Sequence, residues 1–83
     1  MGDRIPTARL VGQRMRARRE ALGMSQAQLG ALVGVSAPTI SGQESADRQV
    51  DLDHMDRVAA ALGVSVPYLV GGASDEVADE TAP

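Results

Sequence analysis

The chain has 83 residues, of which 8 are basic and 11 are acidic, and its formal net charge is −3. All the basic residues are arginine, cysteine is absent, and Tyr68 is the one aromatic residue. This length allows one small domain, and the lack of cysteine excludes disulfides and thiolate metal sites. No stretch provides the roughly 20 apolar residues that span a bilayer. We therefore expect a cytoplasmic protein with an aliphatic core and no membrane contact.

An acidic total disfavours a nucleic-acid partner, but the charge is unevenly distributed. Residues 1–24 carry six of the eight arginines and a net charge of +4. Residues 73–83 carry four acidic residues and no basic one. The acidic total is therefore a property of the C-terminal end. We expect residues 1–7 to be a flexible lead-in, residues 8–72 to form the domain, and residues 73–83 to be an acidic disordered tail.

The first predicted helix covers about residues 8–22, where helix-forming residues dominate, and Gly23 ends it. The helical period of 3.6 residues predicts which of its side chains are buried. They are Val11, Met15, Arg18 and Leu22. We expect the stem of Arg18 to cover apolar surface while its charged end reaches solvent.

A second helix is predicted from a capping box, in which Ser25 is the N-cap and Gln28 its partner three residues later. Gly34 ends this helix. Its expected buried residues are Leu29, Leu32 and Val33.

Ser36 is the N-cap of a third helix, and Pro38 stands in the first turn, where a missing N–H does no harm. This helix is expected to run to about Ser45, with Ile40 as its apolar anchor. A polar connection over residues 45–50 follows.

The fourth predicted helix covers residues 52–62 after the N-cap Asp51, and a short fifth helix covers residues 66–70 after the N-cap Ser65. The fourth helix places His54 on its expected solvent side. Its expected buried residues are Leu52, Met55, Val58, Ala59 and Leu62. Five short helices with short connections indicate an all-α domain.

The second and third helices are joined by a tight turn over residues 33–36. Gly34 permits the sharp reversal, and Ser36 orients the third helix with its N-terminus outward. Two short helices joined in this way describe a helix-turn-helix. A helix presented like this can enter the major groove of DNA and reach base edges with its first turn.

The segments LGMSQAQLGALVGVSAPTISGQE and VAAALGVSVPYLVGG resemble the XRE/Cro/C1-repressor type of helix-turn-helix domain. The resemblance covers about residues 8–72. It implies a compact five-helix fold like that of lambda repressor, with the third helix as reader. By register, the groove-facing positions are Ala37, Pro38, Thr39, Ser41, Gly42 and Gln43.

The resemblance also implies other roles. Gln26 matches a phosphate-contacting position, and Arg19 and Glu44 match an ion pair that ties the first helix to the third. The candidate phosphate contacts are Arg14, Arg16, Arg18, Ser25, Gln26, Ser36 and Arg48. A contact between two copies of the chain could use Tyr68, Leu69 and Val70, which could equally belong to the core.

The third helix departs from the family in ways that affect base readout. Ala37 and Gly42 stand where the family often has long polar side chains, and Gln43 replaces a large apolar residue. Ala46 replaces a usual glycine. No basic residue lies between Gly23 and Asp47, so this helix itself offers no arginine for a bidentate pair with guanine.

Two functions from different classes fit these observations. The first is a repressor-like transcriptional regulator of bacterial or phage type, binding double-stranded DNA as a homodimer on a palindromic operator. The second is a module for protein–protein interaction, such as an antirepressor, an antitoxin or a regulatory adaptor. Because the one histidine has no catalytic or metal-binding neighbours in the pattern, we expect no enzyme activity, cofactor or metal. We also expect no small-molecule effector domain.

Overall fold

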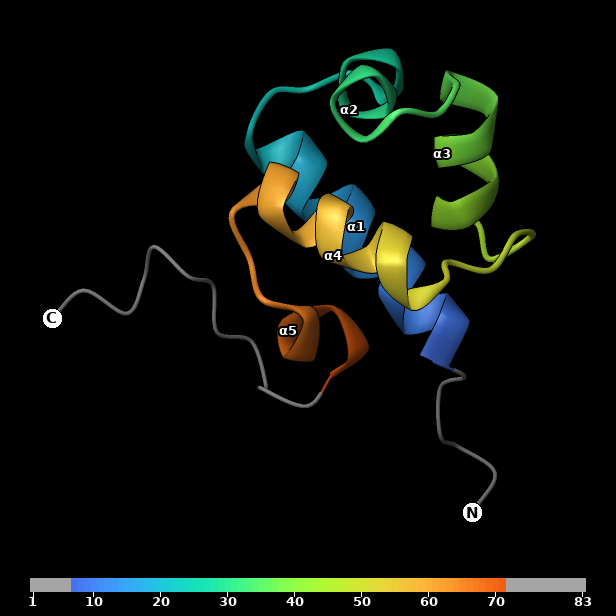
Figure 1. Ribbon diagram of the computed structural model, residues 1–83, viewed down its shortest axis with the longest axis vertical. Helices are drawn as coiled ribbons and strands as arrows, with labels where there is room; N and C mark the ends of the chain where they lie inside the picture. Colours follow the sequence, from blue (N-terminus) through green and yellow to red (C-terminus); the bar gives the residue numbers. More distant parts are fainter. Residues whose placement is uncertain (1–6, 72–83) are drawn as a thin grey trace, which may run out of the picture.

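Five helices follow one another in the computed structural model, which describes residues 7–71 (Figure 1). They are α1 (Thr7–Ala21), α2 (Gln26–Val33), α3 (Ala37–Glu44), α4 (Leu52–Leu62) and α5 (Val66–Val70). No strand occurs within this range. The predicted all-α fold is therefore confirmed. The expected acidic tail over residues 73–83 lies outside the described residues, as does the expected lead-in except for Thr7, which is the first residue of α1.

Side-chain caps fix where four of the helices begin. Ser25 Oγ accepts a hydrogen bond from Gln28 N at 3.0 Å, and Ser25 N donates to Gln28 Oε1 at 2.7 Å, which completes the capping box of α2. Asp51 Oδ1 accepts from His54 N at 2.8 Å at the start of α4. Ser36 and Ser65 cap α3 and α5 in the same way. Each cap stabilises its helix by about 0.5–2 kcal/mol.

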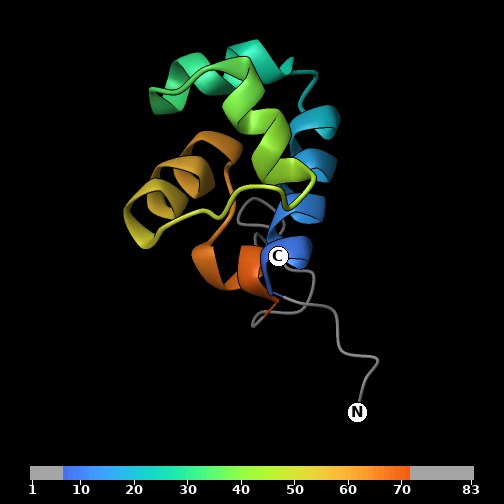
Figure 2. The same ribbon diagram turned by 90° about the vertical axis from the view of Figure 1, so that its right-hand side faces the viewer.

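The core lies between α1 and the other four helices. Helix α1 lies behind α4 in Figure 1 and beside α3 in Figure 2; it contacts α3, α4 and α5, and α2 packs on α3 and α4. The side chains buried there are aliphatic or thioether groups. They are Val11, Met15, Leu29, Val33, Ile40, Met55, Val58, Ala59, Leu62, Val64 and Leu69.

Gly12 allows α1 to approach the C-terminal end of α3 closely. A β-carbon added at Gly12 would lie 2.5 Å from the carbonyl oxygens of Gln43 and Glu44. The two backbones could not keep this distance with any other residue at position 12. The position of α3 on the domain therefore depends on a residue without a side chain.

Three leucines predicted to be buried are exposed, so that part of the sequence interpretation is wrong. Leu22 is 43%, Leu32 62% and Leu52 75% exposed. Leu22 follows the end of α1 and Leu52 is the first residue of α4, so both lie at helix ends, beyond the packed turns. In α2 the neighbouring Leu29 and Val33 already fill the contact with the core. The buried faces of α1, α2 and α4 therefore contain fewer residues than the helical period predicts.

Within residues 7–71, no helix combines the length and apolar character that crossing a membrane requires. The same residues bring together no group of three histidine, aspartate or glutamate side chains that could hold a metal ion.

Candidate nucleic-acid interface

Helices α2 and α3 form the predicted helix-turn-helix. Gly34 has the left-handed φ of 85° that a tight reversal needs, and its N–H donates to the carbonyl oxygen of Gly30 at 2.8 Å. Val35 N donates to the same oxygen at 2.9 Å. Ser36 Oγ then caps α3 by accepting from Thr39 N at 3.3 Å. The turn presents α3 along the outside of the domain, as Figure 2 shows.

The outward face of α3 is small and uncharged. Pro38 and Ser41 are exposed, and Ala37, Thr39 and Gly42 are half-buried. Five of the six predicted base-contact positions therefore have some access to solvent. This face offers methyl and methylene groups and hydroxyls, which suit contact with a thymine methyl or a single hydrogen bond to a base edge.

Gln43, the sixth position, is turned inward. It is 5% exposed, and its Oε1 lies 3.1 Å from Nε2 of His54 on α4. Because Gln43 follows Ile40 by three residues, it lies on the same buried side of α3. Its side chain connects α3 to α4 and does not reach the outward face.

The interpretation of His54 as a surface residue is wrong. His54 is only 7% exposed, and burial lowers the pKa of its imidazole, with a smaller contribution from Arg57 in the same direction and an opposing one from Asp51. Because the Gln43 oxygen can only accept, its contact with His54 requires the hydrogen on Nε2. The sequence shows a polar side chain at position 43 and a histidine eleven residues later. Neither their spacing nor the helical period predicts that the two side chains meet.

The structure brings Arg19 and Glu44 together, as the resemblance implied. Arg19 Nε donates to Glu44 Oε2 at 2.7 Å, and Arg19 Nη2 donates to Glu44 Oε1 at 3.1 Å. Arg19 Nη1 also donates to the carbonyl oxygen of Met24 at 2.8 Å. The hydrogen bonds to Glu44 raise the pKa of Arg19 against the opposing effect of burial.

Gln26 belongs to the same network, since its Nε2 donates to Glu44 Oε1 at 3.1 Å. The Glu44 carboxylate thus receives three hydrogen bonds, two from α1 and one from the first residue of α2. These contacts fix the angle between α1, the start of α2 and the end of α3. They also hold Gln26 at the point where the resemblance places a phosphate contact.

Two of the predicted phosphate contacts on α1 make structural contacts on the far side of that helix. Arg14 Nη1 donates to the carbonyl oxygen of Tyr68 at 2.8 Å, and its guanidinium lies 4.7 Å from the centre of the Tyr68 ring. Arg18 Nε donates to the carbonyl oxygen of Leu62 at 2.8 Å. At 100° per residue, Arg14 points about 140–160° and Arg18 about 100–120° away from Gly12 and Arg19, which face α3.

The remaining phosphate candidates are exposed or lie near α2 and α3. Arg16 is exposed and pairs with Glu20 one turn later at 3.1 Å. Ser25 and Ser36 stand at the starts of α2 and α3 and are engaged in their caps. Arg48 is exposed in the connection between α3 and α4.

The three residues predicted for a contact between two copies of the chain differ in their exposure to solvent. Leu69 is fully buried and belongs to the core, whereas Tyr68 is half-buried and Val70 is 37% exposed. Only Tyr68 and Val70 therefore reach the surface of α5.

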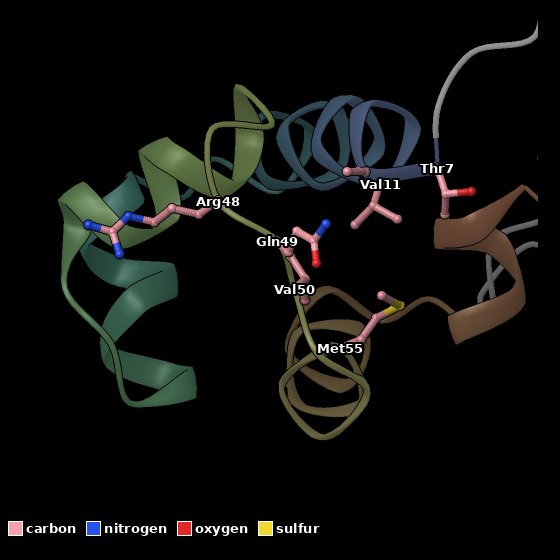
Figure 3. A pocket seen from close by; sticks show the side chains of 7 residues that line it. Thr7, Val11, Arg48, Gln49, Val50 and Met55 are labelled. Carbon is pink, nitrogen blue, oxygen red and sulfur yellow. The ribbon is translucent and has the colours of Figure 1, made fainter.

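A cavity of about 210 Å³ opens between the start of α1, the connection after α3, and α4 (Figure 3). Its walls are mostly apolar. The lining residues are Thr7, Ala8, Val11, Arg48, Gln49, Val50 and Met55. The side chain of Arg48 runs away from this cavity toward α3 (Figure 3).

A sequence comparison finds a relative in Repressor protein C2 of Salmonella phage P22. The two are 40% identical over 63 residues, which are 76% of this chain and 29% of the phage protein. The chain thus spans less than a third of the length of this curated relative.

Solved structures with the same fold include the P22 c2 repressor in complex with synthetic operator 9T. It has a TM-score of 0.71 and 39% identity over 75% of this chain and 94% of that chain. The restriction-modification controller protein C.AhdI from Aeromonas hydrophila has a TM-score of 0.70 and 34% identity, with the same coverage.

Hydroxypropylphosphonic acid epoxidase from S. wedmorenis also matches, with a TM-score of 0.72 and 26% identity over 77% of this chain. The match covers only 34% of that enzyme, so it concerns the helical fold and not the whole protein. A family model described as helix-turn-helix matches residues 15–69, which include all of α2, α3 and α4, the second half of α1 and α5 without its last residue. On the strength of this match, and of the geometry of α2 and α3, the chain belongs to the helix-turn-helix family of the XRE/Cro/C1-repressor type.

Proposed function

We propose that this protein binds double-stranded DNA as a repressor-like transcriptional regulator of bacterial or phage type, with α3 in the major groove. The observation that carries the proposal is the rigid presentation of α3. Its N-terminus is capped, its C-terminal end is held by the buried Arg19–Glu44 pair, and its outward face is free of acidic side chains. The similarity to a phage repressor solved with operator DNA supports the same function.

The residues proposed to meet the bases are Ala37, Pro38, Thr39, Ser41 and Gly42. The polar groups proposed to meet phosphates lie on α1 and at the starts of α2 and α3. Helix N-termini such as these two starts favour anions. The proposed phosphate contacts are Arg16, Ser25, Gln26 and Ser36. Arg14 and Arg18 are assigned to the packing of α1 on α4 and α5.

A homodimer on a palindromic operator is the proposed assembly, because dimers of this motif bind two half-sites about 34 Å apart. The half-buried Tyr68 and the exposed Val70 are the residues of α5 proposed for the contact. Val70→Glu should weaken the dimer in sedimentation experiments, whereas Leu52→Glu, at an exposed apolar residue of α4, should not. Equal dissociation of both variants would contradict the role of α5.

The test of DNA binding begins with selection from a random duplex library, followed by titration of the selected site at several salt concentrations. The logarithm of affinity should fall with the logarithm of salt by about 0.9 for each phosphate contacted. Ser41→Glu places a carboxylate on the outward face of α3 and should abolish binding. Ala60→Glu makes the same change at an exposed small residue of α4 and should leave binding intact.

The second candidate function is a protein–protein interaction module, such as an antirepressor, an antitoxin or a regulatory adaptor. It is favoured by one observation, the lack of a basic side chain on the outward face of α3 itself. If the protein bound no duplex at low salt, even random duplex, the DNA-binding function would be rejected in favour of this one.

A further inference from the structure

The connection between α3 and α4 folds back over α3 at Gly42. A β-carbon added at Gly42 would lie 2.8 Å from Cδ, 3.0 Å from Cγ and 3.1 Å from Nε of Arg48. The stem of Arg48 therefore fills the space that a side chain at position 42 would occupy. Figure 3 shows this stem passing beside α3 with the guanidinium at its far end.

The backbone fixes Arg48 in this position. The N–H groups of Asp47 and Arg48 both donate to the carbonyl oxygen of Gly42, at 2.8 and 3.0 Å. Ser45 Oγ donates to the same oxygen at 3.2 Å and to Asp47 Oδ2 at 3.1 Å. The connection after α3 is therefore hydrogen-bonded to Gly42, the residue that Arg48 covers. The position of Arg48 is fixed by these backbone contacts as well as by its own side chain.

The guanidinium of Arg48 is available to a ligand. The residue is exposed, and the hydrogen bonds and ion pairs found within residues 7–71 include none to its guanidinium. The nearest carboxylate in sequence, on Asp47, accepts a hydrogen bond from Ser45. The Arg48 guanidinium thus lies beside the outward face of α3, whose own side chains there carry no charge.

We propose that Arg48 supplies the base-reading side chain that α3 lacks at Gly42, and that its guanidinium pairs with O6 and N7 of a guanine in the major groove. The inference rests on the proposed DNA-binding function. Gly42 stands at a groove-facing position, and only arginine among the side chains near it has the paired donors that fit a guanine edge. Glycine at position 42 is then required because any β-carbon would displace the reader.

The test uses the operator selected by the wild-type protein and its single base-pair substitutions. The wild type should prefer guanine at one position of each half-site by about 5- to 150-fold, the range expected for one bidentate pair. Arg48→Ala should remove this preference. Arg48→Lys keeps the charge and the salt dependence but should reduce the preference, because an ammonium lacks the planar pair of parallel donors of a guanidinium.

Gly42→Ala should reduce the same preference although alanine favours the helix, and a melting curve shows that the variant is folded. In the Arg48→Ala background, Gly42→Ala should have no further effect on the preference. Arg57→Ala removes an exposed arginine from α4 and should leave the preference unchanged.

Two results would overturn the inference while leaving the DNA-binding function in place. The first is a uniform loss of affinity for all sequences with Arg48→Ala, together with a salt slope lowered by about one contact, which would assign Arg48 to a phosphate. The second is an unchanged base preference in Arg48→Ala. Failure of the proposed function has a different signature, since the wild-type protein itself would then bind no duplex.

Discussion

Removing the Glu44 carboxylate should destabilise the whole domain. Glu44→Ala leaves the Arg19 guanidinium with the carbonyl oxygen of Met24 and, at 3.8 Å, the exposed Glu20 carboxylate, and it removes the acceptor of the Gln26 amide. The side chains of Arg19 and Glu44 are 10% and 4% exposed, so water cannot take the place of the lost carboxylate without structural change. Breaking one partner of such a buried pair costs about 3–5 kcal/mol.

This loss is large against the stability of a small domain, which is about 5–15 kcal/mol. A change of 1 kcal/mol moves the melting temperature of a domain of this size by about 4–8 °C, so Glu44→Ala should melt at least about 12 °C below the wild type. Circular dichroism during heating measures the shift, and urea unfolding measures the free energy. Because the pair is buried, the difference should persist in 1 M NaCl, where surface pairs are screened.

A double variant separates the broken pair from the general loss of packing. Arg19→Met combined with Glu44→Leu replaces both charges with apolar groups and should be more stable than Glu44→Ala alone. Unfolding free energies of Glu44→Ala and the wild type that agree within about 1 kcal/mol would refute the reasoning, because that is the value of an exposed pair.

Three further predictions concern stability. Since burial lowers the pKa of His54, the unfolded chain binds the proton more tightly, and the free energy of unfolding should fall as pH drops below about 6.5; urea titrations should show a weaker dependence in His54→Gln. Ala46 has a left-handed φ of 68°, which strains alanine more than glycine. Ala46→Gly should therefore stabilise the domain by about 0.5–1 kcal/mol and raise its melting temperature by a few degrees. A melting temperature below that of the wild type would contradict this backbone strain. Gly12→Ala should force α1 from α3 and lower the melting temperature by more than about 4 °C, despite the better helix propensity of alanine; no change would mean that the backbones separate at little cost.

The sequence predicted the helices well because their boundaries depend on local chemistry. Ser25, Ser36, Asp51 and Ser65 each cap the helix that follows, and the observed bounds differ from the predicted ones by about one residue. Capping is decided within three or four residues of chain, so no knowledge of the tertiary structure was needed.

The buried faces were predicted less well because burial depends on what each helix meets. Leu32 has the period of a core residue but faces solvent, and Arg19 is buried although it is charged. The partner of Gln43 is His54, eleven residues later on α4, and Arg48 reaches Gly42 from the loop that returns over α3; neither contact has a periodic signal. Gln43 is turned away from the outward face of α3, and Arg48 covers Gly42 on it, so the sequence predicted least well which side chains line the candidate interface.

The assignment of Arg14 and Arg18 to contacts with α5 and the end of α4 has a kinetic consequence. The N-terminal segment carries a charge of +4, yet these two arginines lie on the side of α1 away from α3, and Arg19 is neutralised internally. A DNA-binding surface with few cations releases few counterions, so its affinity for arbitrary sequence is low. Under the proposed function, the protein should slide over only short lengths of duplex before it dissociates, and it should reach its operator mainly by repeated encounters from solution.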